Sequence, residues 1–139
     1  MKEIIISKDK YQELVDHSLE EKPLEACGIL AGVKEGDTYK VEKIYIMENT
    51  SASSEEYLMA PEEQFEVFKD IRENELELVS IFHSHPHSPS RPSLKDIDMA
   101  YYPEAVYIII SLVNPEKAVF KGFEINDESY QEIDVIIKE

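Results

Sequence analysis

The sequence predicts a single α/β domain, of the α+β kind, in which a mixed β-sheet is flanked by helices. Apolar, strand-like runs are interleaved with three segments that have helical character, and the chain ends in strand-like runs with no helix between them. The length of 139 residues suits one domain with a core of its own. We therefore expect residues 1–139 to form one three-layer domain.

The N-terminal part predicts a strand, a helix and two further strands. Three successive isoleucines place the first strand at Glu3–Ser7, and Ser7 is a suitable N-cap for a helix that ends at Pro23. Small and apolar residues predict strands at Ala26–Val33 and Tyr39–Met47. Alternate residues of the latter are expected on one face: Val41, Lys43, Tyr45 and Met47.

A polar loop at Asn49–Glu56 separates this part from the second helix. Tyr57–Met59 is expected to be a short extended piece. Pro61 suits the first position of the helix, which has acidic residues in its first turn and basic residues near its end. Its apolar stripe is expected to pack in the core: Phe65, Phe68 and Ile71.

The C-terminal half predicts four strands around a short helix. Leu76–Phe82 is an apolar run typical of a buried strand, and Ser93–Ala100 begins like a helix. Ala105–Val113 is so continuously apolar that we expect it to be central in the sheet. Ala118–Ile125 and Tyr130–Ile137 flank a turn and predict an antiparallel hairpin.

Charge and cysteine content exclude several classes of protein. Thirty acidic residues against fourteen basic ones give a formal net charge of -16, which disfavours binding to nucleic acid or to an anionic membrane surface. A single cysteine excludes an internal disulfide, and no segment suits a secretory signal or a membrane span. We expect a cytoplasmic protein, and the sequence leaves open whether it forms a homodimer.

The segment from His83 to Asp96 carries the strongest functional signal. In an extended conformation His83 and His85 point the same way, and Pro86 favours that conformation. Asp96, in the first turn of the helix that Ser93 begins, can fold back toward them. Two imidazoles and one carboxylate are the three protein ligands of a catalytic zinc site whose fourth position holds water. A histidine pair alone also occurs by chance on surface loops.

The complete string is H-S-H-P, six residues, S, two residues, D. It matches the motif of the JAMM (MPN+) metalloprotease family at every defined position, and Leu24–Gly32 resembles the family's glutamate segment. The resemblance covers nearly the whole chain and implies the MPN fold, which is similar to that of cytidine deaminases. The C-x-x-C zinc signature of the deaminases is absent here.

The resemblance also implies the roles of the site residues. His83, His85 and Asp96 would hold one zinc ion per chain, and a zinc-bound water would attack an amide bond with Glu25 as general base. Ser93 would stabilise the oxyanion, a role compatible with capping its helix. Without the downstream motif, Glu25 would be interpreted as a surface residue.

Family members with these ligands act on the C-terminus of ubiquitin or ubiquitin-like proteins. This chain resembles the minimal prokaryotic form, which implies deconjugation of a ubiquitin-like modifier. The alternative is a peptidase that removes a C-terminal cysteine or tail from a small sulfur carrier protein. A third hypothesis is a non-catalytic scaffold, but that would require missing ligands, and all are present.

Several other residues are candidates for substrate contact or chemistry. An edge strand formed by Tyr57, Leu58 and Met59 could bind an extended substrate tail, with packing of the loop as the alternative. Arg91, an exposed charge inside the motif loop, could touch the substrate chain. Cys27 is expected to be a small packed residue rather than a nucleophile, and His87 is expected in solvent.

Overall fold

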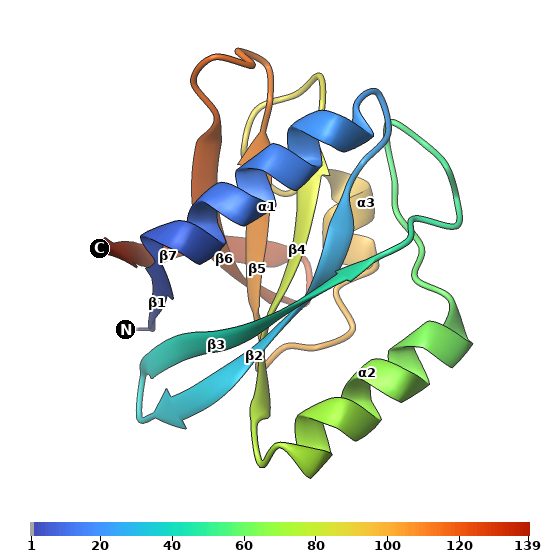
Figure 1. The fold of residues 1–139 in the computed structure, drawn as a ribbon. Helices are drawn as coiled ribbons and strands as arrows, with labels where there is room; N and C mark the ends of the chain where they lie inside the picture. Colours follow the sequence, from blue (N-terminus) through green and yellow to red (C-terminus); the bar gives the residue numbers. More distant parts are fainter. Residues whose placement is uncertain (1) are drawn as a thin grey trace.

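The computed structural model describes residues 2–139, which form seven strands and three helices (Figure 1). Met1 lies outside the described residues. The elements, in chain order, are β1 (Glu3–Ser7), α1 (Lys8–Glu21), β2 (Cys27–Glu35), β3 (Thr38–Met47), α2 (Pro61–Glu73), β4 (Glu77–His85), α3 (Leu94–Asp98), β5 (Val106–Ser111), β6 (Val119–Asn126) and β7 (Ser129–Lys138).

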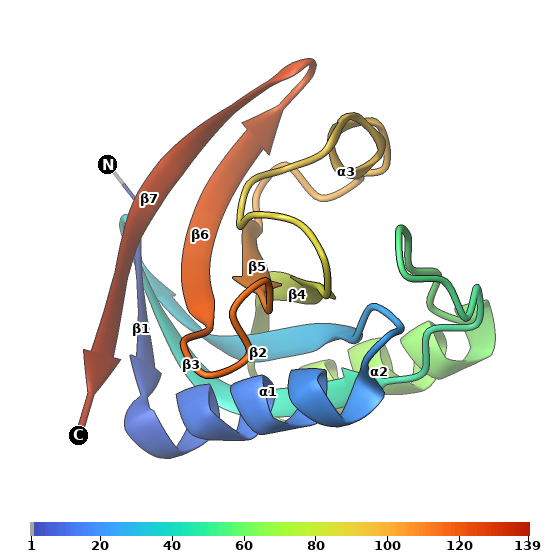
Figure 2. The same ribbon diagram turned by 90° about the horizontal axis from the view of Figure 1, so that it is seen from above.

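The strands form one mixed sheet that closes into a barrel in the order β1-β3-β2-β4-β5-β6-β7. β1 is parallel to both β3 and β7, and β4 is parallel to β5, whereas the other pairs are antiparallel. The mixed sheet, the place of β5 between two neighbours and the β6–β7 hairpin are thus confirmed. The closure differs from the expected layers: curved β6 and β7 bring the sheet back to β1 (Figure 2).

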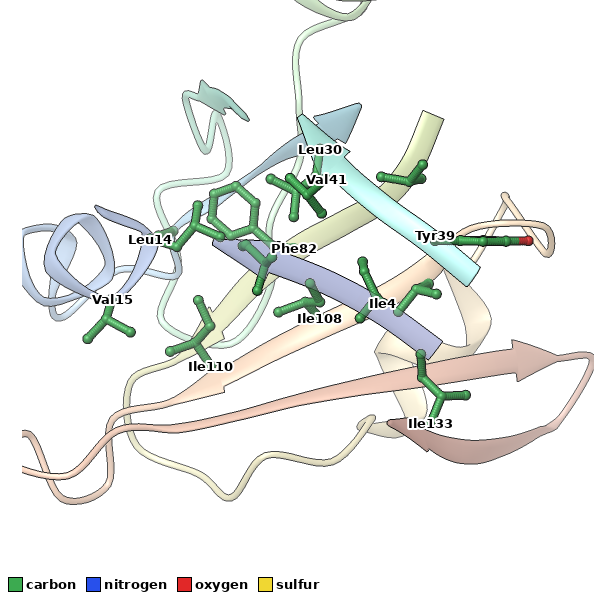
Figure 3. Packing of buried hydrophobic residues seen from close by; sticks show 14 of the residues in the cluster. Ile4, Leu14, Val15, Leu30, Tyr39, Val41, Phe82, Ile108, Ile110 and Ile133 are labelled. Atoms are coloured by element: carbon green, nitrogen blue, oxygen red, sulfur yellow. The ribbon is translucent and has the colours of Figure 1, made fainter. Parts of the chain in front are cut away.

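Two clusters of buried apolar side chains lie on opposite faces of the sheet. Phe82 of β4 belongs to the first cluster, together with Leu14 of α1 (Figure 3). Its neighbour Ile81 belongs to the second, together with Ile71 of α2. Because successive side chains of a strand point to opposite faces, α1 and α2 cover different faces of the sheet.

The expected face of β3 is correct for Lys43, Tyr45 and Met47, but a β-bulge turns Val41 to the other face. The register of β2 against β3 shifts between Ala31 and Gly32. Val41 therefore packs in the first cluster, whereas Tyr45 and Met47 contact the second. A bulge adds one residue to a strand and reverses the facing of everything beyond it.

The stripe predicted for α2 is correct at two of its three positions. Ile71 is buried, and Phe68 packs against the second cluster. Phe65 is 64% exposed, and Val67 is buried in its place. Val67 and Ile71 are four residues apart, so the helix contacts the sheet along the line that joins them.

The boundaries of β4 and α3 also differ from the prediction. β4 continues through His85 instead of ending at Phe82, and α3 is a short helix that ends at Asp98.

Within residues 2–139, no helix combines the length and the apolar character that crossing a membrane requires.

Candidate metal centre

Both motif histidines lie at the end of β4, on the sheet face that also carries Ile81. In the strand register His83 is paired with Cys27 of β2 and with Ile109 of β5, so neighbours on both sides fix its position. The expected extended conformation is confirmed. His83 and His85 are both buried near the end of the strand, with exposed fractions of 1% and 4%.

Asp96 reaches the histidines from α3 because Ser93 caps that helix. The Ser93 Oγ accepts a hydrogen bond from the Asp96 N–H at 3.1 Å, and the Asp96 Oδ2 accepts one from the Ser93 N–H at 2.9 Å. This reciprocal capping box fixes the carboxylate in the first turn. Its oxygens lie 3.2 Å from His83 Nε2 and 3.0 Å from His85 Nε2.

The three side chains fit a metal ion. The two Nε2 atoms are 3.1 Å apart, and all three candidate ligand atoms lie within 4.8 Å of one another. Ligands of a tetrahedral zinc ion, each about 2.0–2.2 Å from the metal, are about 3.3 Å apart. His85 Nδ1 lies 2.8 Å from the Pro89 carbonyl oxygen, to which it would donate its proton when Nε2 binds a metal ion, and this contact orients the ring.

The charges of the set also suit a divalent cation. Burial opposes ionisation of Asp96, but hydrogen bonds with His83 and His85 hold its pKa well below the usual range. Burial lowers the pKa of His83 despite the adjacent carboxylate. A carboxylate and a neutral imidazole are the protonation states in which Asp96 and His83 would bind a metal ion.

Glu25 lies in the segment just before β2 and is 3% exposed. Its Oε1 is buried and has no hydrogen-bond partner among the described residues. Burial, with the negative charges of Asp96 and Glu56, raises the pKa of Glu25 to about 9. A cation held by Asp96 would reverse part of this effect, because a nearby positive charge favours the carboxylate form.

Asn49 holds this glutamate in place and was not singled out from the sequence. Its Nδ2 donates hydrogen bonds to the carbonyl oxygens of Glu25 at 3.0 Å and Glu56 at 2.9 Å. Its Oδ1 accepts from the backbone N–H groups of Ser51 and Leu58. An asparagine at the start of a polar loop is a recognised turn signal, but its long-range contact with Glu25 leaves no trace in the sequence.

The segment Tyr57–Met59 does not form a strand. The Leu58 N–H donates a hydrogen bond to Asn49 Oδ1, and the Leu58 carbonyl oxygen accepts one from the Thr50 N–H. Tyr57 stacks on the His83 ring at 4.7 Å between centroids, Leu58 is 45% exposed, and Met59 packs against the second apolar cluster. The expected edge strand is therefore wrong, although the segment does lie beside the metal centre.

The remaining candidates lie as follows. Cys27 is fully buried and its thiol faces the Met47 carbonyl oxygen at 3.7 Å; burial raises the pKa of this thiol to about 12. Such a thiol is a poor nucleophile at neutral pH, which agrees with the expected packing role. His87 and Arg91 are both exposed, as predicted.

A pocket of about 340 Å³ connects Glu25 to the metal centre. It is lined by Glu25, Ser54, Glu55, His85, His87, Ser88 and Ser93. Ser93 accepts a hydrogen bond through Oγ, so its own hydroxyl proton can be donated to a molecule in the pocket. The site thus offers a metal-ligand set, a proton acceptor and a hydrogen-bond donor around one space.

A closed mixed barrel with a buried His-His-Asp set and a buried glutamate defines the JAB/MPN class of domains. The chain belongs to the family described as prokaryotic homologs of the JAB domain, whose model matches residues 7–123. This membership confirms the resemblance that the motif indicates.

Two curated relatives and one solved structure are similar to the chain. The CysO-cysteine peptidase of Mycobacterium tuberculosis is 29% identical, over 98% of this chain and 92% of its own length. The desampylase of Pyrococcus furiosus is 32% identical, over 83% of this chain and 77% of its own. A solution structure of a protein from Desulfitobacterium hafniense is 40% identical, with a TM-score of 0.90, and the alignment covers 98% of this chain and 93% of that one.

We expect His85→Ala to lower the zinc bound per chain, because it removes one of three converging ligand atoms. His87→Ala is the matched control: it removes an exposed imidazole two residues away and should leave the zinc content unchanged. Metal analysis of the purified proteins by mass spectrometry measures both. Full zinc retention in His85→Ala would contradict the ligand assignment.

Glu25→Gln should stabilise the zinc-free protein at neutral and alkaline pH. The folded-state pKa of about 9 exceeds the ordinary glutamate value of 4.5. The stability that Glu25 contributes is therefore fully present below about pH 4.5 and is lost as the pH rises toward 9. Because glutamine cannot ionise, the free energy of unfolding of the variant should increasingly exceed that of the wild type as the pH rises through this range. Urea unfolding at several pH values measures this difference, with Glu128→Gln, at an exposed position in the β6–β7 turn, as control. A pH-independent difference would refute the argument.

Proposed function

We propose that this protein is a zinc-dependent peptidase that hydrolyses the amide bond at the C-terminus of a ubiquitin-like protein. The observation that carries the proposal is the pocket in which Glu25, His85 and Ser93 meet. A buried glutamate whose Oε1 has no hydrogen-bond partner in residues 2–139, beside a buried candidate ligand set, serves no evident structural purpose.

Each residue has a role that its position supports. When bound, the zinc ion would polarise the scissile carbonyl and make a water more acidic. Glu25 accepts a proton from the attacking water and passes it to the leaving amine as the carbon–nitrogen bond breaks. The Ser93 hydroxyl donates to the developing oxyanion. The ubiquitin-like protein keeps a carboxylate, and the amine departs with the proton.

Two kinds of leaving group are candidates, and the relatives support both. The desampylase favours deconjugation of a ubiquitin-like modifier. The CysO-cysteine peptidase, which aligns with more of this chain, favours removal of a C-terminal cysteine from a sulfur carrier. The presence of every ligand and of Glu25 argues against a non-catalytic scaffold. A cytoplasmic location would suit the free, buried Cys27.

The test uses CysO of Mycobacterium tuberculosis carrying a C-terminal cysteine, with the same CysO joined to the ε-amino group of a lysine as second substrate. Zinc-loaded protein should cleave at least one of them, and mass spectrometry identifies the bond. Cleavage of neither substrate would refute the proposed function. The ratio of kcat/KM values for the two decides between the leaving groups.

Glu25→Gln should lower kcat on the cleaved substrate by about a hundredfold to ten-thousandfold, the usual contribution of a general base, while zinc content stays the same. Cys27→Ala is the control for the alternative nucleophile and should remain active. An active Glu25→Gln variant would remove Glu25 from the mechanism. A folded but inactive Cys27→Ala variant would restore the thiol hypothesis.

A further inference from the structure

A second pocket adjoins the metal centre on the side of the motif loop. It measures about 250 Å³ and is lined by His85, Ser88, Pro89, Arg91, Pro92 and Ser93. It therefore shares His85, Ser88 and Ser93 with the pocket that contains Glu25. A chain bound across the metal centre can extend from one pocket directly into the other.

Arg91 gives this second pocket an unusual charge for so acidic a protein. Basic residues number only fourteen against thirty acidic ones, yet no carboxylate in residues 2–139 forms an ion pair with Arg91. The Arg91 N–H donates to the Pro89 carbonyl oxygen at 2.9 Å, and Pro92 follows it, so the backbone that presents the guanidinium is restrained.

The charge around the metal centre is unequal on its two sides. Glu25 and Glu55 line the first pocket. Beyond Arg91 the surface continues into a groove of about 530 Å³ that is also lined by Lys117 and Lys121. The Lys121 Nζ lies 3.8 Å from Glu132 Oε1 in the same groove. An anionic group on a bound substrate is therefore repelled by the exposed Glu55 carboxylate on one side and attracted by the Arg91 guanidinium on the other.

We propose that the pocket beside His85 and Ser93 takes the residue that leaves, and that Arg91 binds the free α-carboxylate of this residue. When the leaving group is a single C-terminal residue, only the amide nitrogen and one α-carbon separate its carboxylate from the scissile carbonyl. That carboxylate must then lie in a pocket that touches the reaction centre, as this one does. The inference rests on the proposed function.

The two kinds of leaving group differ in this respect. A lysine ε-amine in an isopeptide bond has a flexible alkyl stem, and no carboxylate, next to the reacting nitrogen. A terminal cysteine carries its carboxylate on the α-carbon next to the reacting nitrogen. A guanidinium can bind this carboxylate with two parallel hydrogen bonds. Arg91 thus selects for removal of one terminal residue over deconjugation.

The experiment compares two substrates that differ only in this charge. CysO of Mycobacterium tuberculosis, prepared as a thioester, is ligated to cysteine or to cysteinamide, and kcat/KM is measured with zinc-loaded protein. The wild type should prefer the free acid by roughly tenfold, since a charge-assisted hydrogen bond contributes on this scale. Arg91→Gln should bring the ratio close to one, and Arg91→Lys should retain part of it.

The control is Arg72→Gln, which removes an exposed cation in the last turn of α2 and should keep the wild-type ratio. Zinc content and melting temperature of all variants show whether any has lost its fold. Equal cleavage of acid and amide by the wild type, or an unchanged ratio in Arg91→Gln, overturns the role of Arg91 and leaves the peptidase intact. Cleavage of neither substrate overturns both.

Discussion

The site depends on the burial of one carboxylate, Asp96, between two imidazoles. Three polar groups this close together, almost without exposure, cost much desolvation energy unless a cation or hydrogen bonds compensate. The fold meets this constraint from two directions. β4 is paired on both sides, so His83 and His85 share a face, and the capping box of Ser93 fixes Asp96 opposite them. A shift of one residue in β4 would turn both imidazoles to the other face.

Glu25, the proposed proton acceptor, is held by a separate part of the chain. The Glu25 N–H donates to the Ser53 carbonyl oxygen at 2.8 Å, and Asn49 donates to the carbonyl oxygen of Glu25. Both partners belong to the loop between β3 and α2, which also places Tyr57 on the His83 ring. This loop therefore joins the proposed general base to the candidate ligand set, and the geometry of the pocket depends on its position.

The sequence predicts what depends on local spacing and periodicity. The distances along the chain from His83 to Asp96 determine the ligand set, and apolar runs locate all seven strands. It does not predict what depends on distant contacts. Pairing of β1 with β7 closes the barrel, and the bulge at Glu42 reverses the facing of β3. The position of α2 decides that Val67 rather than Phe65 is buried. The hydrogen bonds of Asn49 cross 24 residues to reach Glu25 and leave no periodic signal.

The residues proposed for the reaction and the residue proposed for the choice of substrate lie in different parts of the same segment. His85 and Asp96 lie at its ends, in a strand and in a capped helix, and their positions are fixed by backbone pairing. Arg91 lies between them, with its side chain exposed and free of ion pairs in the described chain. A substitution at this position changes the charge of the neighbouring pocket without moving a ligand. In this proposal the residue that selects the leaving group, Arg91, is therefore not one of the residues that break the bond.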